Sequence, residues 1–259
     1  MDHIALNDTG LQLPPRTSKP RRAGLTMVID GGLPAGQFTD VVWSGADYID
    51  MVKFGWGTAL VTPNLDAKID ILKAHDIGFY FGGTLFEKFV SQGRFDDFRK
   101  FCHRWDCRHV EVSNGTIAMS NIEKASYVRK LADEFTVVSE VGFKDPTRSE
   151  QLPPSQWVEF IGEDLEAGAS MVTLEARESG KSGICRPDGE LRFGLIEDVL
   201  ASGLSEDMLL FEAPTTALQA HFVRRIGPNV NLGNVPASGV ISLETLRLGL
   251  RADTLTAFE

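Results

Sequence analysis

The chain has 259 residues, of which 42% are hydrophobic and 24% charged, an ordinary composition for a globular protein with a sizeable core. Its net charge of −10 argues against a general surface for nucleic acid or for anionic membranes. No stretch is apolar for long enough to span a membrane, and the polar amino terminus lacks the apolar core of a signal peptide. Three cysteines are an odd number, which disfavours a disulfide framework and leads us to expect a reducing, cytoplasmic location.

Residues 1–22 are predicted to form a short N-terminal arm. They are polar, with three prolines and four basic residues, and we expect them to be solvated or to lie at the base of the folded domain. Residues 23–259 contain no linker or low-complexity tract, so we predict that they form a single domain.

Eight short apolar runs follow the arm in chain order, and each has the character of a buried parallel strand. They cover residues 24–30, 47–55, 77–83, 108–115, 136–144, 170–178, 207–214 and 229–234. Helix-like stretches follow almost every run, at residues 64–76, 87–105, 121–135, 153–169, 193–203, 215–227 and 242–255. Asn64, and either Ser120 or Asn121, are the predicted N-caps of two of them. Eight alternating units predict the α/β class and a (β/α)₈ TIM barrel.

Polar residues that can do chemistry lie at or near the ends of these runs, where the active sites of such barrels are found. They are Asp30, Lys53, Glu111, Glu140, Lys144, Glu175, Arg177, Glu212 and Asn234. None of the five histidines lies at a predicted strand end. Acid–base catalysis must therefore fall to lysine or to carboxylates.

Two lysines are the candidate catalytic residues. Lys53 lies between Val52 and Phe54 on a predicted strand, so its ammonium group must point into the barrel mouth or be paired with an acid. Lys144 follows Glu140 closely enough to reach the same pocket. An ion pair with a neighbouring glutamate is the alternative role for Lys53.

Three glutamates at the ends of neighbouring runs are the candidate metal ligands: Glu111, Glu140 and Glu175. Carboxylates placed so closely repel one another unless a cation shares the site. Oxygen ligands at a barrel mouth suit Mg²⁺, which prefers one or two carboxylates together with water and substrate oxygens. A ring of salt bridges with Lys53 and Lys144 is an equally weighted alternative.

The loop after the sixth run has the composition of an anion-binding lid, although it is not a Walker A motif. Loops after the seventh and eighth strands also often hold phosphate in TIM barrels, although asparagines there could instead form turns. We assign the following residues to substrate binding: Asp30, Arg177, Ser179, Gly180, Lys181, Ser182, Gly183, Glu212, Asn231, Gly233 and Asn234.

Motifs spread along the chain together resemble the phosphosulfolactate synthase family over about residues 18–256. They are KFGWGT (53–58), GGTLFE (82–87), VEVSNG (110–115), SEVG (139–142), DLEAGA (164–169), LEARESGKSGI (174–184), FEAP (211–214), NVNLGNV (229–235) and LETLRLGLRADT (243–254). The resemblance implies a (β/α)₈ barrel and the Mg²⁺-dependent addition of sulfite to phosphoenolpyruvate, an early step toward coenzyme M. It also implies a homo-oligomer.

The resemblance and the strand-end residues agree on a mechanism. Mg²⁺ held by some of the three glutamates would stabilise an enediolate formed when sulfite attacks, and Lys144 or Lys53 would protonate the adjacent carbon. Two positions depart from the family pattern, because Gly31 and Phe143 stand where the family usually has lysine. The nucleophile could therefore be something other than sulfite, or the product a different adduct of phosphoenolpyruvate.

Three hypotheses remain. The first is a sulfite-adding lyase, the second is a related barrel enzyme that adds another small nucleophile to phosphoenolpyruvate, and the third is a non-catalytic, heat-stress-associated relative. The charged rim disfavours the third, because a scaffold has no need of so many like-charged strand ends.

Overall fold

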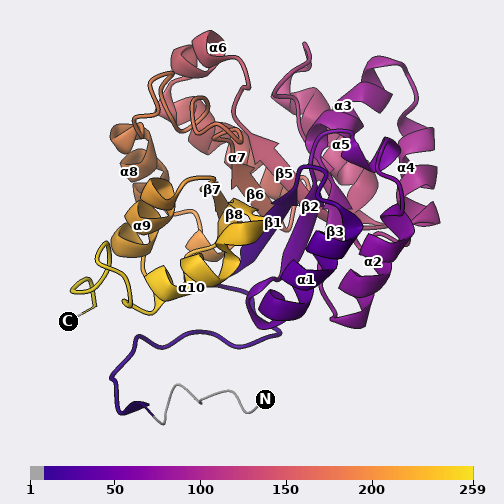
Figure 1. Ribbon diagram of the computed structural model, residues 1–259. Helices are drawn as coiled ribbons and strands as arrows, with labels where there is room; N and C mark the ends of the chain where they lie inside the picture. Colours follow the sequence, from indigo (N-terminus) through magenta and orange to yellow (C-terminus); the bar gives the residue numbers. More distant parts are fainter. Residues whose placement is uncertain (1–8, 259) are drawn as a thin grey trace.

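Eight parallel strands alternate with helices along the chain, as the sequence predicts (Figure 1). The computed structural model describes residues 9–258. The strands are β1 (Thr26–Asp30), β2 (Met51–Phe54), β3 (Gly78–Phe81), β4 (His109–Val112), β5 (Thr136–Val141), β6 (Met171–Leu174), β7 (Leu209–Glu212) and β8 (Leu232–Pro236). Seven strands lie within their predicted apolar runs, and β8 begins inside its run and extends two residues beyond it.

The helices surround the strands, and their number and bounds differ from the prediction in several places. The stretch 87–105 forms two helices because Gly93 adopts a φ of 68° between them. The last helix ends at Arg247, shortly before Gly249, and two helices that were not predicted follow β1 and β5. The helices are α1 (Ala35–Gly45), α2 (Leu65–Ala74), α3 (Gly83–Ser91), α4 (Phe95–Arg104), α5 (Asn121–Ala132), α6 (Pro146–Gln151), α7 (Pro154–Glu166), α8 (Phe193–Ala201), α9 (Thr216–Arg225) and α10 (Val240–Arg247).

One of the two predicted helix caps is confirmed. The Oγ atom of Ser120 accepts a hydrogen bond from the Glu123 N–H at 3.2 Å, which satisfies a free donor at the start of α5. Asn64 precedes α2, but its φ of 58° turns the side chain away and it makes no capping hydrogen bond. The prediction for Asn64 was wrong because it rested on residue type alone, and capping needs an extended backbone at that position.

The strands form a nearly closed barrel. Parallel hydrogen-bonded pairs run in the order β3-β2-β1-β8-β7-β6-β5-β4. β3 and β4 lie side by side across the remaining gap, where the ring of His109 packs against Gly78. The register of β1 against β8 shifts once, next to Asn234, whose φ is 50°. This irregularity re-aims the end of β8, as β-bulges often do beside active sites.

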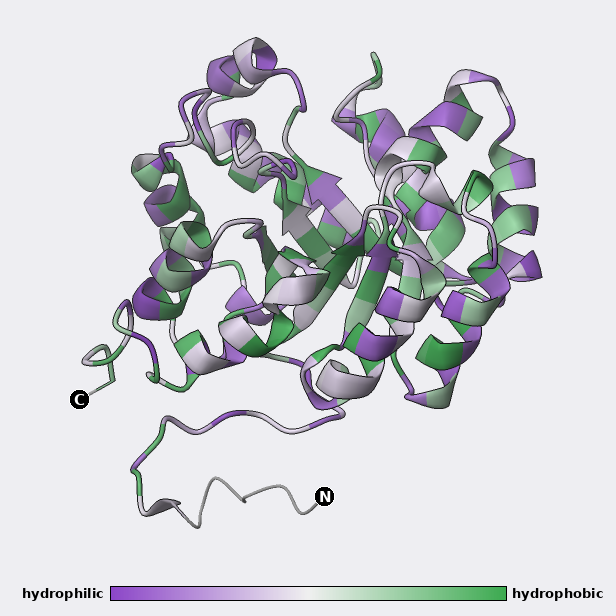
Figure 2. Cartoon of the chain, in the orientation of Figure 1, coloured by the Kyte–Doolittle hydropathy of each residue, from purple (hydrophilic) through white to green (hydrophobic). Residues whose placement is uncertain are grey.

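The main core lies between the barrel wall and the helices. Apolar side chains are concentrated on the strands and on the helix faces turned toward them, while polar residues cover the outer surface (Figure 2). Inside the barrel a much smaller apolar cluster fills the middle, made of Leu25, Met27, Met51, Tyr80, Val138 and Leu210. A packed middle separates the two ends of the barrel from each other.

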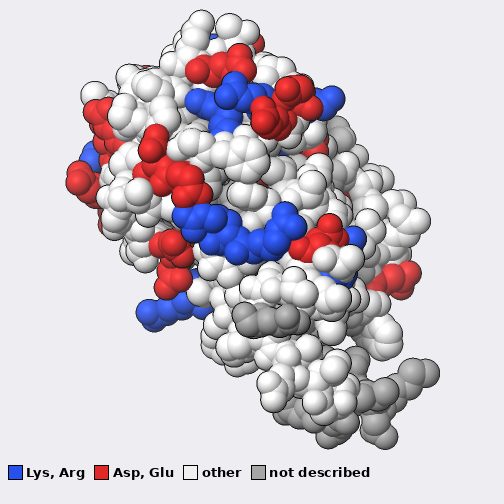
Figure 3. All heavy atoms as spheres, turned by 90° about the vertical axis from the view of Figure 1, so that its left-hand side faces the viewer, with Lys and Arg blue, Asp and Glu red and all other residues white. Residues whose placement is uncertain are grey.

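The described part of the arm runs along the amino-terminal end of the barrel, at the bottom of Figure 1. Arg16 forms an ion pair with Glu244 of α10 at 2.8 Å, and Arg21 forms one with Asp50 at 2.9 Å. On the side that carries α8 and α9, basic side chains lie beside acidic ones (Figure 3), and Arg225 pairs with Glu197 at 2.7 Å. Within residues 9–258, no helix has both the length and the apolar character needed to cross a bilayer.

Candidate active site

Six charged side chains line one narrow pocket at the carboxyl ends of the strands. Residues two apart on a strand point to the same side, so the last inward position of each strand faces the barrel axis. Five of the six are 5% exposed or less, and Lys144 is partly open to solvent. The six are Lys53, Glu111, Glu140, Lys144, Glu175 and Glu212.

Lys53 lies at the centre of the carboxylates. Its Nζ atom is 3.0 Å from Glu212 Oε1, 3.3 Å from Glu111 Oε1 and 3.7 Å from Glu140 Oε2. Burial acts to lower the pKa of Lys53, but these carboxylates together outweigh it and hold the pKa well above its usual value. Lys53 is therefore a fixed positive charge at neutral pH and not a base.

Lys144 joins the other two carboxylates. Its Nζ atom donates hydrogen bonds to Glu140 Oε1 at 2.6 Å and to Glu175 Oε2 at 2.5 Å. Burial acts against the charged form, yet Glu140 and Glu175 raise the pKa of Lys144 well above its ordinary value. Its side chain is 22% exposed against 6% for Lys53, so Lys144 is the ammonium group that a substrate can reach.

The glutamates are poorly solvated acids. Burial is the main cause that raises the pKa of Glu111, of Glu140 and of Glu175. Glu140 and Glu175 also lie close enough to share a hydrogen bond, and the charge of Glu175 raises the pKa of Glu140 further. Glu212 accepts the Ala176 N–H at 2.8 Å, which fixes its carboxylate.

Four buried carboxylates face only two ammonium groups in this pocket. Within residues 9–258, no three acidic, histidine or cysteine side chains form a ready-made metal cage. The ring of salt bridges that the sequence left open is present, because the carboxylates point at Lys53 and Lys144. The excess of negative charge and the close pair Glu140–Glu175 nevertheless suit one divalent cation that takes its other ligands from water and substrate.

The loop after β6 supplies two further charged residues to the pocket, Arg177 and Glu178. Arg177 lines it, has a φ of 59° and donates from Nη1 to the Lys144 carbonyl at 3.4 Å. Ser182 is buried and donates to the Phe143 carbonyl at 2.7 Å, so it anchors the loop. A side chain at Gly183 would overlap the Glu175 carbonyl, and Gly180 also has a positive φ. Ser179 and Lys181 are exposed.

Both carboxylate oxygens of Asp30 are bonded to other groups of the protein. One oxygen is 2.5 Å from the Nζ atom of Lys68, and the other accepts the N–H groups of Gly32 and Leu33 at 2.9 and 2.8 Å. Asp30 therefore shapes the turn after β1, and we leave it out of the proposed substrate contacts. The sequence signal for its partner was a lysine on the apolar face of α2, between Leu65 and Leu72.

The three candidate residues around β8 lie at different depths in the barrel. Asn231 is at the amino-terminal end, where it accepts the Leu25 N–H and donates to the Leu209 carbonyl, so we leave it out of the site. Gly233 packs against Met27 and Leu210 inside the barrel. Asn234 does line the pocket, is 3% exposed, and its Oδ1 atom has no partner among the described residues.

Two residues near the pocket escaped the sequence analysis. Glu87 is buried, accepts a hydrogen bond from Ser113 Oγ at 2.5 Å, and accepts the Thr116 N–H at 2.9 Å. It thereby orders the loop after β4. Tyr80 lies inside the barrel, and its buried hydroxyl has no partner within residues 9–258. The sequence did contain a signal for each residue. Glu87 is an acid inside the apolar stretch LFEKF, and Tyr80 lies at an inward position of a predicted strand.

Comparisons with known proteins agree with this architecture. The family model described as ComA, (2R)-phospho-3-sulfolactate synthase, matches residues 14–253. A phosphosulfolactate synthase of Bacillus subtilis (strain 168) is 51% identical over 96% of this chain and 99% of the relative. One of Methanothermobacter thermautotrophicus is 40% identical over 93% of this chain and 95% of the relative.

Among solved structures, the YdjI aldolase of Escherichia coli K12 has a similar fold, with a TM-score of 0.55 at 12% identity over 91% of this chain and 89% of that one. At this identity the likeness concerns the fold alone. The sequence relatives extend over almost the whole chain, and they are enzymes by name. The chain therefore belongs to the phosphosulfolactate synthase family.

Proposed function

We propose that this protein is a carbon–sulfur lyase that adds sulfite to phosphoenolpyruvate with the help of Mg²⁺ and gives (2R)-phospho-3-sulfolactate for coenzyme M synthesis. The observation that carries the proposal is the convergence of four carboxylates and two lysines in one buried pocket. The family to which the chain belongs supplies the reaction.

The metal would be held by Glu140 and Glu175, with Glu111 as a third candidate ligand. Glu140 and Glu175 lie within hydrogen-bond reach of each other and the ammonium group of Lys144 bonds to both, so Mg²⁺ would share these two carboxylates with Lys144. When bound, Mg²⁺ would stabilise the negative charge that develops on the substrate carboxylate.

The carbon–sulfur bond forms when the sulfur lone pair of sulfite attacks the methylene carbon of phosphoenolpyruvate. The electron pair of the carbon–carbon double bond then moves toward the carboxylate. Lys144 donates a proton to the adjacent carbon, since its ammonium is charged at neutral pH and partly exposed. Lys53 remains charged and offsets the negative charge of the surrounding carboxylates and of the substrate.

Substrate phosphate would bind at the side of the pocket formed by the loops after β6 and β8. Arg177 presents a guanidinium group there, which suits the oxygens of a phosphate. Asn234 lies at the same rim, and its unpartnered atom is Oδ1, an acceptor that is available to a donor and not to a phosphate oxygen. The exposed residues Ser179 and Lys181 would reach the phosphate only if the loop closed over it.

Phosphorus NMR of the protein with phosphoenolpyruvate, Mg²⁺ and sulfite tests the proposal. We expect loss of phosphoenolpyruvate and one new phosphate ester, only when sulfite is present, with no reaction after EDTA treatment and recovery when Mg²⁺ is returned. A calorimetric titration of Mg²⁺ into the wild type and into Glu175→Gln gives a separate measure of metal binding. Unchanged phosphoenolpyruvate under all these conditions would refute the proposal.

A different nucleophile is the second candidate, and one observation favours it. A groove of about 730 Å³ adjoins the pocket, sharing Ile29, Glu178 and Asn234 with it, and the described residues that line it include no lysine or arginine. Gly31 lines this groove where the family usually has lysine, and Phe143 instead packs against Arg148. Consumption of phosphoenolpyruvate with a neutral nucleophile but not with sulfite would favour this candidate.

The remaining proposals concern the cellular location, the kind of substrate and the oligomeric state of the enzyme. We propose that it works in the cytoplasm on small anionic substrates and that it forms a homo-oligomer. Trp43 of α1 is 75% exposed and Ile241 of α10 is 48% exposed, which suits helix faces covered by a second copy. Light scattering on the purified chain measures the subunit number, and a monomer at micromolar concentration would contradict the proposal.

A further inference from the structure

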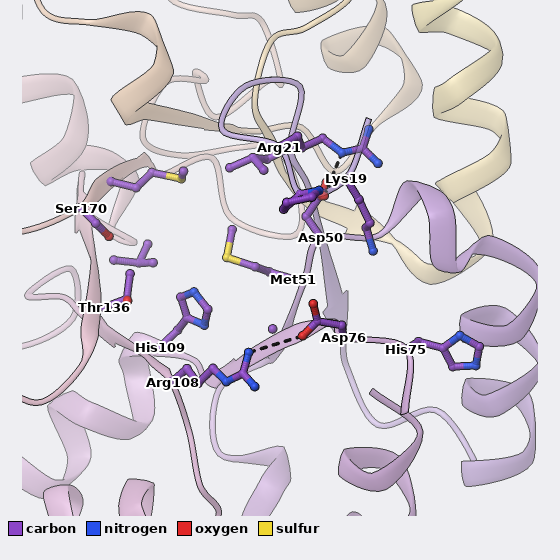
Figure 4. A pocket seen from close by; sticks show the side chains of 15 residues that line it. Lys19, Arg21, Asp50, Met51, His75, Asp76, Arg108, His109, Thr136 and Ser170 are labelled. Atoms are coloured by element: carbon purple, nitrogen blue, oxygen red, sulfur yellow. Dashed lines mark hydrogen bonds and ion pairs between the residues drawn. The ribbon is translucent and has the colours of Figure 1, made fainter. Parts of the chain in front are cut away.

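A second hollow lies at the opposite, amino-terminal end of the barrel (Figure 4). Its volume is about 550 Å³, within the range of small-molecule sites. The hollow exists because the first inward positions of several strands carry small side chains. Gly78 of β3 has none and Thr136 of β5 has a short one, while Ser170, just before β6, also lines the hollow and donates its hydroxyl to the Val137 carbonyl at 2.8 Å. The arm closes one side with Lys19 and Arg21.

The charged groups around this hollow are mostly basic. Arg21 pairs with Asp50 at 2.9 Å, and Arg108 pairs with Asp76 at 3.4 Å across the gap between β3 and β4. Lys19 donates to the Ala46 carbonyl at 2.6 Å and forms no ion pair with a described residue. Once these pairs are formed, a positive charge remains in a chain whose net charge is −10.

One buried polar atom also lacks a partner here. The ring of His109 lies in the hollow, and its Nδ1 atom has no hydrogen-bond partner among residues 9–258 (Figure 4). Burial lowers the pKa of His109, and Arg108 lowers it further. Burial also lowers the pKa of Lys19. For Lys19 the effect of burial outweighs the opposing charges of Asp50, Asp47 and Asp76.

The floor of the hollow is apolar. Leu25, Met51, Val138 and Met171 line it, and the two methionines present flexible thioethers that adapt to flat or irregular ligands. The lining thus combines basic groups and hydroxyls at the rim with an apolar surface below. A ligand that matches both parts has an anionic head and a small apolar body.

We propose that the amino-terminal mouth of the barrel is a second ligand site, separate from the catalytic pocket, for a small organic anion whose apolar body rests on Met51 and Met171. On β5, Glu140 in the catalytic pocket lies four positions after Thr136 at this mouth, a distance of about 13 Å along an extended strand. The packed cluster around Met27 and Leu210 lies between the two sites. A ligand here would not touch the substrates.

Histidine ring NMR on the full chain gives a direct readout, because few histidines are present and they lie in different places. Benzoate is the probe, with benzamide as its neutral match and inorganic phosphate as an anion without an apolar body. We expect benzoate to shift the ring signals of His109, and those of His75 at the margin, while His103 and His221 stay unchanged. Weaker shifts are expected with phosphate and none with benzamide.

Two variants locate the binding. Thr136→Phe fills the hollow from an exposed position, and Lys19→Met removes the basic group while keeping its length. Each is expected to weaken benzoate binding about tenfold or more, a loss of about 1.4 kcal/mol, and to leave the turnover of phosphoenolpyruvate as in the wild type. Lys88→Met, on the exposed face of α3, is the matched control.

Three results would overturn the proposal. They are no shift of His109 with benzoate at millimolar concentrations, equal shifts with benzamide, and unchanged affinity in Thr136→Phe while its fold, checked by circular dichroism, is intact. These outcomes are independent of the catalytic assignment, because the readout is binding and the probes are not substrates.

Discussion

The two ends of this barrel are built from the same strands but differ in how tightly they are packed and in how their charged groups are buried. At the carboxyl end six charged side chains fill a pocket whose remaining free volume is only about 20 Å³. At the amino end small side chains leave about 550 Å³, and an ion pair such as Arg108–Asp76 has its side chains 80% and 88% exposed. Burying charge is costly unless every group is paired. The carboxyl end therefore carries an arrangement that stability alone does not explain, which supports the proposal that it is the catalytic site.

The largest expected effect comes from Lys144. Lys144→Ala removes the proposed proton donor and should lower kcat by about 10²–10⁴-fold, the range for general acid catalysis. Steady-state kinetics with phosphoenolpyruvate and sulfite measures it. Lys144→Arg keeps the charge and should preserve the fold but recover little activity, whereas Lys88→Ala should match the wild type. A Lys144→Ala protein with normal turnover would exclude Lys144 from the chemistry.

A second prediction concerns stability at the carboxyl end. Lys68→Met leaves Asp30 buried without its ion-pair partner, and we expect the free energy of unfolding to fall by about 3–5 kcal/mol. Urea titration followed by circular dichroism measures it. Because Asp30 would then be the uncompensated charge, adding Asp30→Asn should restore part of the loss. A loss that does not depend on residue 30 would point to packing of the lysine stem instead.

The third prediction uses the raised pKa values of the glutamates. Burial raises the pKa of Glu140, and the charge of Glu175 raises it further. If Glu140 must be ionised, activity falls with decreasing pH at a higher pH than for an ordinary glutamate. Glu175→Gln removes the second cause, so the acid limb of kcat/KM should move to lower pH while activity drops about 10²-fold. An acid limb that stays in place would show that Glu140 does not control it.

A smaller effect is expected at the rim. Arg177→Lys keeps the positive charge but loses the two-pronged donor geometry, so KM for phosphoenolpyruvate should rise about tenfold, with a smaller change in kcat. Initial rates over a range of phosphoenolpyruvate concentrations separate the two constants. An unchanged KM would remove Arg177 from the phosphate contacts.

The smallest effect completes the comparison. Arg108→Ala breaks the exposed pair with Asp76 at the amino end, and the free energy of unfolding should change by less than about 0.5 kcal/mol. Thermal or urea unfolding beside Lys68→Met shows the contrast directly. A change as large as that of Lys68→Met would mean that the two ends do not differ in the way their charges are buried.

The sequence by itself determined the fold, because a barrel strand flanked by helices must be apolar along its length and polar only where it ends. That pattern is readable for all eight strands, and it also placed Lys53, Glu111, Glu140 and Glu175 at the same end. The family followed from motifs that occur at those ends.

Only the tertiary structure decided which neighbours each polar residue meets. Asp30 and Asn231 have the residue types of a binding site, but Lys68 and the Leu209 carbonyl satisfy them inside the protein. The hollow beside His109 arises from small residues on strands far apart in the chain. The periodicity of a strand shows whether a side chain points into the barrel. The depth of that side chain along the barrel depends on strand register, and its hydrogen-bond partners depend on packing. Neither register nor packing is a property of a local stretch of sequence.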